Sequence, residues 1–411
     1  MYNGLPIVTN KVTIEEQNGI PHHLLGFVSL DEEPWRVGLF KKQASQIIRE
    51  IRSRGRLPIL VGGTHYYTQS LIFEDTLVQE EQDGELDEQQ EMTHQEIDEK
   101  FPILVGPTEI MIEKLKEVDP VMADRWHPKD RRKIRRSLEI FFLTGKRASE
   151  IYDTQQNDKF SKPGSKLLTE NDASAAASDL SSTLFFWVYS EPETLKKRLD
   201  SRVDKMIESG LLDEVKSMDE FLRQKLQSKT EVDLGRGIWV SIGWKEFEKY
   251  LAALENKSGS QKDLDELLLQ SIEQVKAATR QYARRQNRWI RTKLVSALLD
   301  HNYLEHLYLL DGTDLNEWPH SVSKVALDVA HNFLCGGQLP APSELSDLAK
   351  ELLAPSDLNK PAELFVKREC VTCHTTVITE DQWNKHLKSR THRRLEKKKA
   401  FKSTETEILP T

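Results

Sequence analysis

Two cysteines and two histidines near the C-terminal end place the tightest constraint on how part of this chain can fold. In the stretch CVTCHTTVITEDQWNKHLKSRTH, two residues separate Cys370 from Cys373, twelve more precede His386, and five more precede His392. Two thiolates from a turn and two imidazoles from a helix can complete a tetrahedral zinc shell at this spacing. Four unrelated side chains in a disordered tail are the alternative, but this spacing is among the more specific metal patterns. We therefore expect a structural Zn²⁺ site.

The residues between the cysteines and the histidines predict how this small module folds. Thr379 lies three residues before Gln382, which is the spacing of a capping box at the start of a helix. Trp383 and Leu387 are one helical turn apart and are expected to form a minimal core. A module of this size needs its metal in order to fold.

The basic run KSRTHRRLEKKK that begins just before the last histidine is suited to phosphate contact. It is equally compatible with a solvated tail or an import signal. A single module of this kind is unlike the tandem fingers that follow a DNA major groove, which favours a structured RNA as the partner.

Composition limits the remaining possibilities. The 411 residues are 38% apolar and 30% charged, which indicates ordered domains separated by solvated insertions. The net charge of −8 argues against a uniformly basic nucleic-acid binder but not against a local basic surface. No apolar run is long enough to cross a bilayer. Three cysteines are too few for a disulfide framework, so an intracellular setting is expected. Cys335 is expected to be a buried thiol, and His374 is not expected to bind the zinc ion.

Shifts in composition divide the chain into successive regions. Acidic, polar residues fill 78–99, and residues 158–182 have the composition of a disordered linker. The expected regions are a first part of an α/β core (1–77), an acidic and helical insertion (78–157), a disordered linker (158–182), the rest of the core (183–335), a second linker (336–362) and the finger with its basic tail (363–400).

The stretch LPILVGGTHYY reads as a strand, a turn and a helix of an α/β sheet. Its turn would lie at the carboxyl end of the strand, where such folds bind ligands. Gly62 and Gly63 would let the backbone approach a ligand, and Thr64 would begin the helix with its hydroxyl facing the cleft. A plain tight turn is the alternative.

Two cationic helices suggest nucleic acid. RRKIRR at 131–136 is expected to fan its arginines around an exposed helix face, and RQYARRQNRWIR at 280–291 interleaves arginines with Tyr282 and Trp289. Arginine and aromatic planes suit an RNA backbone and unstacked bases, whereas a solvated helix face is the alternative. Arg198 and Arg202, one helical turn apart, could bind a diphosphate or could be surface arginines paired with acidic neighbours.

Several of these motifs, in this order, resemble the tRNA dimethylallyltransferase (tRNA isopentenyltransferase) family. The resemblance covers roughly residues 1–295 without the insertions, and the appended finger resembles the extension of eukaryotic members. It rests on MYNGLPIVTNK, GIPHHLLGFV, GRLPILVGGTHYY, LKEVDPVMADRWHPKDRRKIRRSLEIFFLTGK, RVDKMIESGLLDEV, SIGWKEF and TRQYARRQNRWIR.

The resemblance implies a P-loop-NTPase-like α/β core with an inserted helical domain and a C-terminal C2H2-type zinc finger. It implies transfer of a dimethylallyl group from dimethylallyl diphosphate to N6 of the adenine 3′ of the anticodon. A Mg²⁺ ion is expected to accompany the diphosphate. The adenine would be flipped into a channel. A monomer in cytoplasm and mitochondrion, and also in the nucleus, with no membrane partner, is expected. The family is often described as ATP-binding, but nothing in this sequence suggests that ATP is consumed.

The resemblance also assigns roles to positions of this sequence. Thr64 would lie near the reacting centre. The residues implied to bind the diphosphate substrate are Thr9, Lys11, Gly62, Gly63, Arg198 and Arg202. Those implied to contact the tRNA anticodon stem-loop are Arg132, Lys133, Arg135, Arg136, Ser241, Gly243, Trp244, Lys245, Arg284, Arg285, Gln286, Arg288 and Arg291.

Family members carry a glycine-rich phosphate loop and an Asp-Ser-Met-Gln segment ahead of the position that Met1 and Tyr2 occupy. Neither occurs in this sequence, and the aspartate expected to act as general base is absent with them. The sequence as written is therefore expected to be an incomplete and inactive or misfolded form of the enzyme. The alternatives are a non-catalytic RNA-binding zinc-finger protein derived from the same family and, third, a DNA-binding regulator.

Overall fold

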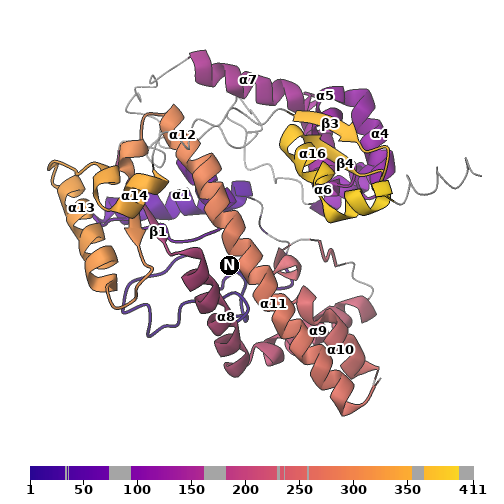
Figure 1. Ribbon diagram of the computed structural model, residues 1–411, viewed down its shortest axis with the longest axis horizontal. Coiled ribbons are helices and arrows are strands. Elements are labelled where there is room, and N and C mark those ends of the chain that lie inside the picture. Colours follow the sequence, from indigo (N-terminus) through magenta and orange to yellow (C-terminus); the bar gives the residue numbers. More distant parts are fainter. Residues whose placement is uncertain are drawn as a thin grey trace, which may run out of the picture. The chain divides into compact units, whose positions relative to one another are not determined.

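The computed structural model divides the chain into two compact units (Figure 1). The core unit comprises residues 1–77 and 166–359, and the finger unit comprises residues 78–165 and 360–411. The structure describes residues 1–73 except 33, 34 and 36, residues 94–161, residues 182–256 except 229–231 and 236, residues 259–353, and residues 365–397.

A parallel pair of strands lies at the centre of one half of the core unit. The apolar run at 185–189 forms β1 (Phe185–Tyr189), which pairs in parallel with β2 (Leu307–Asp311). The apolar and aromatic run LFFWVYS is typical of a strand, and it forms one here. Helix α8 (Pro192–Glu208) follows β1, with its proline in the first turn, where a missing N–H costs nothing. Apolar side chains of both strands pack with those of the segment 289–304 in one cluster.

A second apolar cluster forms the other half of the core unit. Helix α9 (Leu211–Gln227) buries four side chains at helical spacing, and a tight segment of 3-10 turns then leads into α10. The spacing of the apolar residues in GLLDEVKSMDEFL dictates this buried stripe. The elements after α9 are η5 (Gly237–Val240), η6 (Lys245–Phe247), α10 (Glu248–Glu255) and α11 (Gln261–Trp289).

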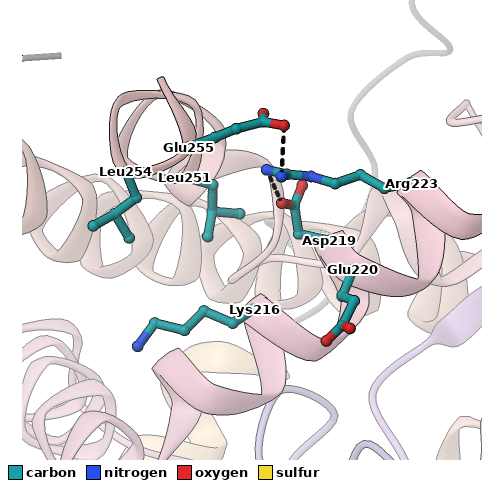
Figure 2. A pocket seen from close by; sticks show the side chains of 7 residues that line it. All are labelled: Lys216, Asp219, Glu220, Arg223, Leu251, Leu254 and Glu255. Atoms are coloured by element: carbon teal, nitrogen blue, oxygen red, sulfur yellow. Dashed lines mark ion pairs between the residues drawn. The ribbon is translucent and has the colours of Figure 1, made fainter. Parts of the chain in front are cut away.

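A surface groove of about 430 Å³ lies between α9 and α10 (Figure 2). Arg223 crosses it with ion pairs to Asp219 at 2.5 Å and to Glu255 at 2.6 Å. None of the site residues expected from the sequence lines this groove. Arg223 is thus neutralised by two carboxylates, and the groove is not the candidate site.

Helix α11 joins the two clusters. A capping box formed by Ser260 and Asp263 starts it, and it continues into a π-helical turn (Ile290–Leu294) and α12 (Val295–Asp300). Val275 is buried in the cluster of α9 and α10, whereas Ile290 is buried in the cluster of the strands. At about 1.5 Å per residue, its 29 residues span roughly 43 Å.

The N-terminal part of the core unit consists mostly of turns before two helices, α1 (Val37–Ser53) and α2 (His65–Ile72). Phe40 and Ala44 of α1 pack on Leu71 of α2 in a small third cluster. Gly55 has a φ of +66°, as expected for the glycine that ends α1.

The strand expected at 57–61 is wrong. These residues form no strand in the described part of the chain, and their side chains are exposed, with Ile59 at 76% and Val61 at 87%. The reason is that a strand needs hydrogen-bonded neighbours, and an apolar run supplies none by itself. The described residues of the core unit therefore contain a two-stranded parallel sheet surrounded by helices, and the fold is mostly helical.

The region expected to be a second linker, 336–362, is folded over residues 336–353, which corrects that expectation for this part. Ala349, Leu352 and Leu353 pack into the strand cluster, and the Tyr308 hydroxyl donates to the Pro340 carbonyl at 3.0 Å. Residues 354–362 lie outside the described part. The elements of this region are η8 (Leu304–His306), the π-helical η9 (Pro319–Lys324), α13 (Val325–Leu334), η10 (Pro342–Glu344) and α14 (Asp347–Leu352).

Cys335 was expected to be buried, and the structure contradicts this. It follows α13 directly and is exposed, because the helix ends there and turns its last residue toward solvent.

The finger unit contains a helical bundle around its own apolar cluster. Asp130 caps α6 by accepting a hydrogen bond from the Lys133 N–H, and Gly145, at a φ of +71°, ends it. The expected disordered linker 158–182 lies outside the described residues over 162–181. The helices are α3 (His94–Lys100), η2 (Pro102–Leu104), α4 (Thr108–Val118), α5 (Pro120–Arg125), α6 (Arg131–Thr144) and α7 (Ala148–Ser161).

The same unit contains an antiparallel hairpin, β3 (Phe365–Glu369) and β4 (Thr376–Thr379), followed by α16 (Glu380–Leu387). The Lys367 ammonium donates to the Ala123 carbonyl near the end of α5 at 3.1 Å, which ties the hairpin to the bundle. Leu387 is 38% exposed, so the expectation that it forms the module's core is wrong. Val377 of β4 is buried instead, because the hairpin rather than the outer helix face packs inward.

Candidate functional site

One face of α11 holds the glycine turn before α2. Tyr282, Gln286 and Trp289 are spaced by four and three residues and therefore lie on one side of the helix. The Gln286 amide donates to the Gly63 carbonyl at 2.5 Å, and the Tyr282 hydroxyl lies 3.4 Å from the Thr64 hydroxyl. The turn and the helix are more than 200 residues apart in the sequence. The expected turn at Gly62 and Gly63 is thus part of an assembled site.

The two glycines of the turn differ in whether a side chain could replace their hydrogen atom. A Cβ on Gly63 would lie 2.2 Å from Nε2 of Gln286, whereas a Cβ on Gly62 would meet open space. Thr64 is the residue before α2 and is exposed, and its hydroxyl does not cap the helix. The Thr64 hydroxyl therefore lies at an exposed position, where its described neighbour is the Tyr282 hydroxyl at 3.4 Å.

His65 is held against α11 by its ring. It stacks on Trp289 with ring centroids 4.4 Å apart and planes within 3° of parallel. Burial lowers the pKa of the His65 imidazole, and its buried Nε2 has no hydrogen-bond partner among the described residues. A neutral imidazole is the form that such a stack favours.

A second group of expected site residues lies in the loop 5–11. The Glu214 carboxylate accepts hydrogen bonds from the N–H groups of Ile7 at 2.9 Å and Val8 at 2.8 Å. This fixes the loop on the first turn of α9. Within the loop, the Thr9 hydroxyl donates to the Leu5 carbonyl.

Lys11 extends from the end of this loop. Its ammonium donates to the Tyr2 carbonyl. Burial lowers the pKa of Lys11, while the nearby carboxylate of Glu214 acts in the opposite direction. Its charge is thus placed in a partly buried setting beside the loop rather than in open solvent.

The turn at 241–245 packs directly on the same loop. Gly243 has a φ of +104°, and a Cβ there would lie 3.0 Å from the Val8 side chain. Its N–H donates to the Glu246 carboxylate at 2.8 Å. Trp244 is buried and Lys245 is exposed, so of these two predicted tRNA contacts only Lys245 is accessible in this structure. The Ser241 hydroxyl is buried and has no partner among the described residues.

The two arginines expected at the diphosphate have different surroundings. The Arg198 guanidinium donates to the carbonyls of Gly312 at 2.6 Å and Thr313 at 2.5 Å, so it ties α8 to the turn after β2. Arg202 is exposed and forms no hydrogen bond or ion pair within the described residues. Of the two, only Arg202 has a guanidinium available for a ligand in this structure. Arg198 holds a backbone turn.

The arginines at the C-terminal end of α11 and just beyond it are exposed. Arg284, Arg285 and Arg288 form no ion pair with any described residue. Arg291 interacts electrostatically with Tyr189. By contrast, Arg280 pairs with Asp200, and Lys276 pairs with Asp204 at 2.7 Å, which fastens α11 to α8. The exposed predicted RNA contacts are Arg284, Arg285, Arg288 and Arg291.

In the finger unit the arginines of α6 do not all fan outward, which corrects that expectation. Arg131 donates to the carbonyls of residues 104–106, and Arg135 pairs with Asp98 at 2.5 Å and Glu139 at 2.7 Å. The helix periodicity places these two arginines against η2 and α3. Arg132 and Arg136 are exposed, and Lys133 lies over the Trp126 ring at 4.8 Å.

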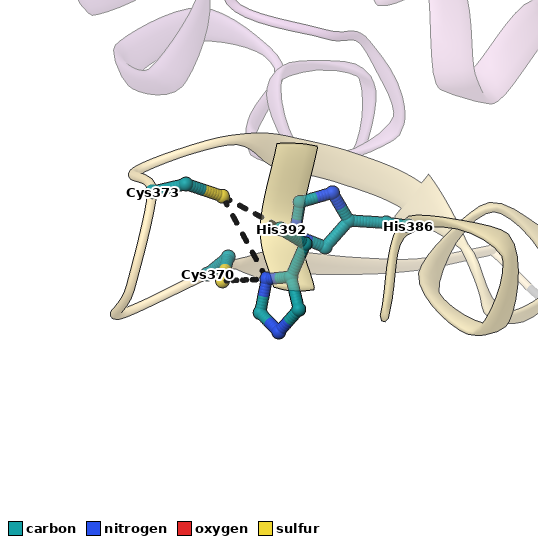
Figure 3. A group of neighbouring side chains, drawn as sticks. All are labelled: Cys370, Cys373, His386 and His392. Carbon is teal, nitrogen blue, oxygen red and sulfur yellow. Dashed lines mark hydrogen bonds between the residues drawn. The ribbon is translucent and has the colours of Figure 1, made fainter. Parts of the chain in front are cut away.

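Cys370, Cys373, His386 and His392 come together at the other end of the finger unit, as Figure 3 shows. Their ligand atoms all lie within 4.8 Å of one another. The Cys370 sulfur is 3.4 Å from Nδ1 of His392, and the Cys373 sulfur is 3.3 Å from Nε2 of His386. Tetrahedral zinc with ordinary bond lengths requires sulfur–nitrogen separations of roughly 3.6 Å. The donor set therefore fits a zinc ion.

The local chain prepares these ligands. Thr379 caps α16 by accepting a hydrogen bond from the Gln382 N–H at 3.2 Å, as expected, whereas the Gln382 side chain accepts from Ile378. Burial opposes ionisation of the Cys370 thiol, but hydrogen bonds from an imidazole and from backbone N–H groups lower its pKa overall. The hydroxyl of Thr375 lowers the pKa of Cys373. Both shifts favour the thiolates that bind metal.

Sequence reasoning missed two site residues. Glu214 stands in the quoted motif RVDKMIESGLLDEV, but nothing local shows that it binds the backbone of a loop some 200 residues away. His65 follows Thr64 directly, and only the fold reveals its stack on Trp289.

Comparison with known proteins places this arrangement in a family. The model of the IPP transferase family matches residues 1–293, which is more than half of the chain. The chain therefore belongs to the IPP transferase family. The resemblance inferred from the ordered motifs is confirmed.

The similar proteins include eukaryotic ones over nearly the whole chain. The tRNA dimethylallyltransferase of Schizosaccharomyces pombe is 38% identical over 410 residues, covering 96% of this chain and 86% of the relative. That of Homo sapiens is 32% identical, covering 95% of this chain and 77% of the relative. A solved structure of a eukaryotic dimethylallyltransferase acting on tRNA has a TM-score of 0.69 and 31% identity, covering 99% of this chain and 90% of that one.

Within the described residues, no helix is both long and apolar enough to span a membrane.

Proposed function

We propose that this protein is a tRNA dimethylallyltransferase, which transfers a dimethylallyl group from dimethylallyl diphosphate to N6 of the adenine 3′ of the anticodon. The observation that carries the proposal is the likeness over 99% of the chain to a eukaryotic dimethylallyltransferase acting on tRNA. The identity of 38% with a curated relative of that name supports it.

The reaction requires two kinds of help from the protein. A bond forms between N6 and C1 of the dimethylallyl group, the bond from C1 to the diphosphate oxygen breaks, and N6 loses a proton. Because an adenine amine is a poor nucleophile, the site must accept that proton and stabilise the leaving diphosphate. The residues named below bind and position the substrates, and we assign the proton transfer to none of them.

The turn of Gly62, Gly63 and Thr64 is the proposed contact with the reacting centre. It is exposed, and its threonine hydroxyl is not used to cap α2. The guanidinium of Arg202 pairs with none of the described residues and is the proposed contact for the diphosphate. Lys11 adds a partly buried positive charge beside the loop that includes Thr9. A Mg²⁺ ion at the diphosphate remains a prediction, as do the monomeric state and the cytoplasmic, mitochondrial and nuclear locations.

The proposed RNA contacts are exposed cations with no acidic partner. Each phosphate contact adds affinity by releasing condensed counterions, so binding must weaken as salt rises. Among the described residues, those that are exposed and form no ion pair are Arg132, Lys245, Arg284, Arg285 and Arg288, whereas Arg136 is exposed but pairs with Glu139 at 3.5 Å.

We also propose that Cys370, Cys373, His386 and His392 bind one structural Zn²⁺. The distances among their ligand atoms and the lowered pKa of both thiols support this assignment. The four residues leave no position for a substrate on a tetrahedral ion, so the metal would stabilise the module rather than take part in the transfer.

The transfer itself can be tested with the purified chain, dimethylallyl diphosphate and an anticodon stem-loop RNA. Digestion of the RNA and mass spectrometry should show one dimethylallyl group on the adenine 3′ of the anticodon, and none when that adenine is replaced by guanine. RNA binding without transfer would favour the non-catalytic RNA-binding alternative. An absence of RNA binding would contradict both.

A matched pair of variants tests the RNA contacts. Arg285→Gln and Arg288→Gln together should weaken stem-loop binding about tenfold and reduce its salt dependence by about two phosphate contacts. Lys262→Gln, near the start of the same helix, should leave binding within twofold. Equal effects of the two changes would contradict the assignment of the arginine face.

A further inference from the structure

We propose that Gln286 is a positioning residue for the transfer: its side-chain amide fixes the Gly63 peptide and thereby sets the Thr64 hydroxyl against the substrate. This inference rests on the proposed function. It also gives Gln286 a role different from that of the neighbouring arginines, although the family resemblance had implied that all of them contact RNA.

The contact between Gln286 and Gly63 is close and specific. The amide nitrogen of Gln286 donates to the Gly63 carbonyl at 2.5 Å, and the glutamine side chain is half-buried. It lies so near the glycine that a Cβ at position 63 would be 2.2 Å from its nitrogen. Gly63 therefore has a steric requirement that Gly62 lacks, and the glutamine creates it.

The direction of the side chain excludes a shared role with the arginines. At about 100° per residue, Tyr282 and Trp289 lie about 40° and 60° from Gln286 on the same side of the helix axis. Arg284 and Arg288 lie about 160° from it in either direction. The contacts of the first two residues with Thr64 and His65 agree with this geometry. The helix thus presents its glutamine to the turn and these arginines to the opposite side.

The turn cannot hold its threonine without help. Thr64 has a φ of −86° and a ψ of +80°, outside both the helical and the extended regions, and its hydroxyl forms no capping bond. The preceding run 57–61 is exposed and forms no strand in the described residues. Fixing the carbonyl of Gly63 fixes the peptide plane that ends at the Thr64 nitrogen. The Gln286 amide therefore fixes the backbone that leads into Thr64, while the Tyr282 hydroxyl, at 3.4 Å, is the neighbour of the Thr64 hydroxyl itself.

A positioning residue affects the rate of transfer more than the affinity for RNA. Displacing a reacting or positioning group by about 1 Å can reduce a rate about a hundredfold. Substitution of Gln286 should consequently lower kcat, while the opposite face of α11 continues to bind the stem-loop.

The decisive variant is Gln286→Met, which keeps the length of the side chain and removes its donor. We expect kcat to fall at least tenfold, with KM for the stem-loop and its Kd within twofold of the unaltered protein. Gln286→Lys, which restores an N–H donor, should recover part of kcat. Arg288→Gln, on the opposite side of the helix, should instead raise the Kd for the stem-loop. A raised Kd for Gln286→Met with unchanged kcat would overturn the proposal, because Gln286 would then be an RNA contact.

A second measurement does not depend on activity. Gly63→Ala should lower the midpoint of thermal unfolding because of the clash with Gln286, and adding Gln286→Ala should restore part of the loss. Hydrogen exchange of residues 62–66 should become faster in Gln286→Met, while exchange of residues 271–279 stays the same. Additive unfolding shifts or unchanged exchange would overturn the positioning role. Absence of transfer by the unaltered protein, with coupling and exchange as expected, would instead refute the proposed function alone.

Discussion

The zinc-ligand group at 370–392 and the glycine turn at 57–65 were both expected from short motifs, yet they are held in different ways. The four ligands of the finger come together within 23 residues, through a hairpin and one capped helix. The glycine turn has no strand before it among the described residues, and a helix more than 200 residues later holds it. A motif that closes on itself specifies its own geometry, whereas the turn depends on contacts that only the completed fold supplies.

The largest expected effect concerns the locally closed region. Replacing Cys370 by serine, or removing the metal with a chelator, should unfold the module at 365–397, because structural zinc contributes on the order of 10 kcal/mol to such folds. Zinc content and protection of this segment from proteolysis measure the effect. Cys335→Ser, at an exposed cysteine outside the group, should keep one zinc per chain. Full zinc binding by the Cys370→Ser variant would contradict the assignment.

The next effect tests the long-range region around the loop 5–11. Glu214→Ala would leave the N–H groups of Ile7 and Val8 without an acceptor, and we expect a loss of about 2–3 kcal/mol in the free energy of unfolding. Glu214→Gln, with one remaining carbonyl oxygen, should lose about half as much. Urea denaturation provides the measurement, with Glu220→Ala at an exposed position of the same helix as the control. A loss equal to that of the control would show that the loop is held otherwise.

A smaller effect is expected at Arg198. Arg198→Ala would free the carbonyls of Gly312 and Thr313, at a cost of about 1–2 kcal/mol in the free energy of unfolding. Lys197→Ala, at an exposed neighbouring position, should change it little. If the variant instead kept its stability and raised KM for dimethylallyl diphosphate, Arg198 would be a diphosphate ligand as the sequence suggested.

The smallest effect is the pH dependence that His65 contributes to the glycine-turn region. Its pKa is lowered by burial in the folded state, so the unfolded chain binds the proton more tightly. The stability it contributes is therefore complete above a pH of about 6.5 and decreases as the pH falls toward the folded-state value. Comparing unfolding midpoints of the unaltered protein and His65→Phe between pH 5 and 7 isolates this slope. Parallel curves would show that the stacked imidazole does not titrate there.

The sequence was sufficient where the determining interactions are local or periodic. The zinc ligands, the cap at Thr379, the strand β1 and the ends of α1 and α6 follow from spacing and from residues with special conformations. It was also sufficient for the family, because many weak motifs in a fixed order are specific together.

It was insufficient where a side chain finds its partner across the fold. Arg135 resembles Arg136 in the sequence, but Asp98 and Glu139 enclose the first, whereas the second is exposed and contacts Glu139 at 3.5 Å. The run at 57–61 has the composition of a buried strand and is exposed, because composition does not supply neighbours. Ion pairing and strand pairing join residues that are distant in the sequence, and a single sequence does not identify which residues become partners.

The continuous winding of α11 makes its length matter as much as its composition. One residue inserted between Val275 and Tyr282 would rotate everything after it by about 100° and remove the glutamine from the glycine turn. Seven inserted residues would restore the direction but displace it by about 10 Å along the axis. Point substitutions on the outer side of this helix should thus leave the fold intact even where they weaken RNA binding. Any change in the number of its residues would instead move Gln286 away from the Gly63 carbonyl.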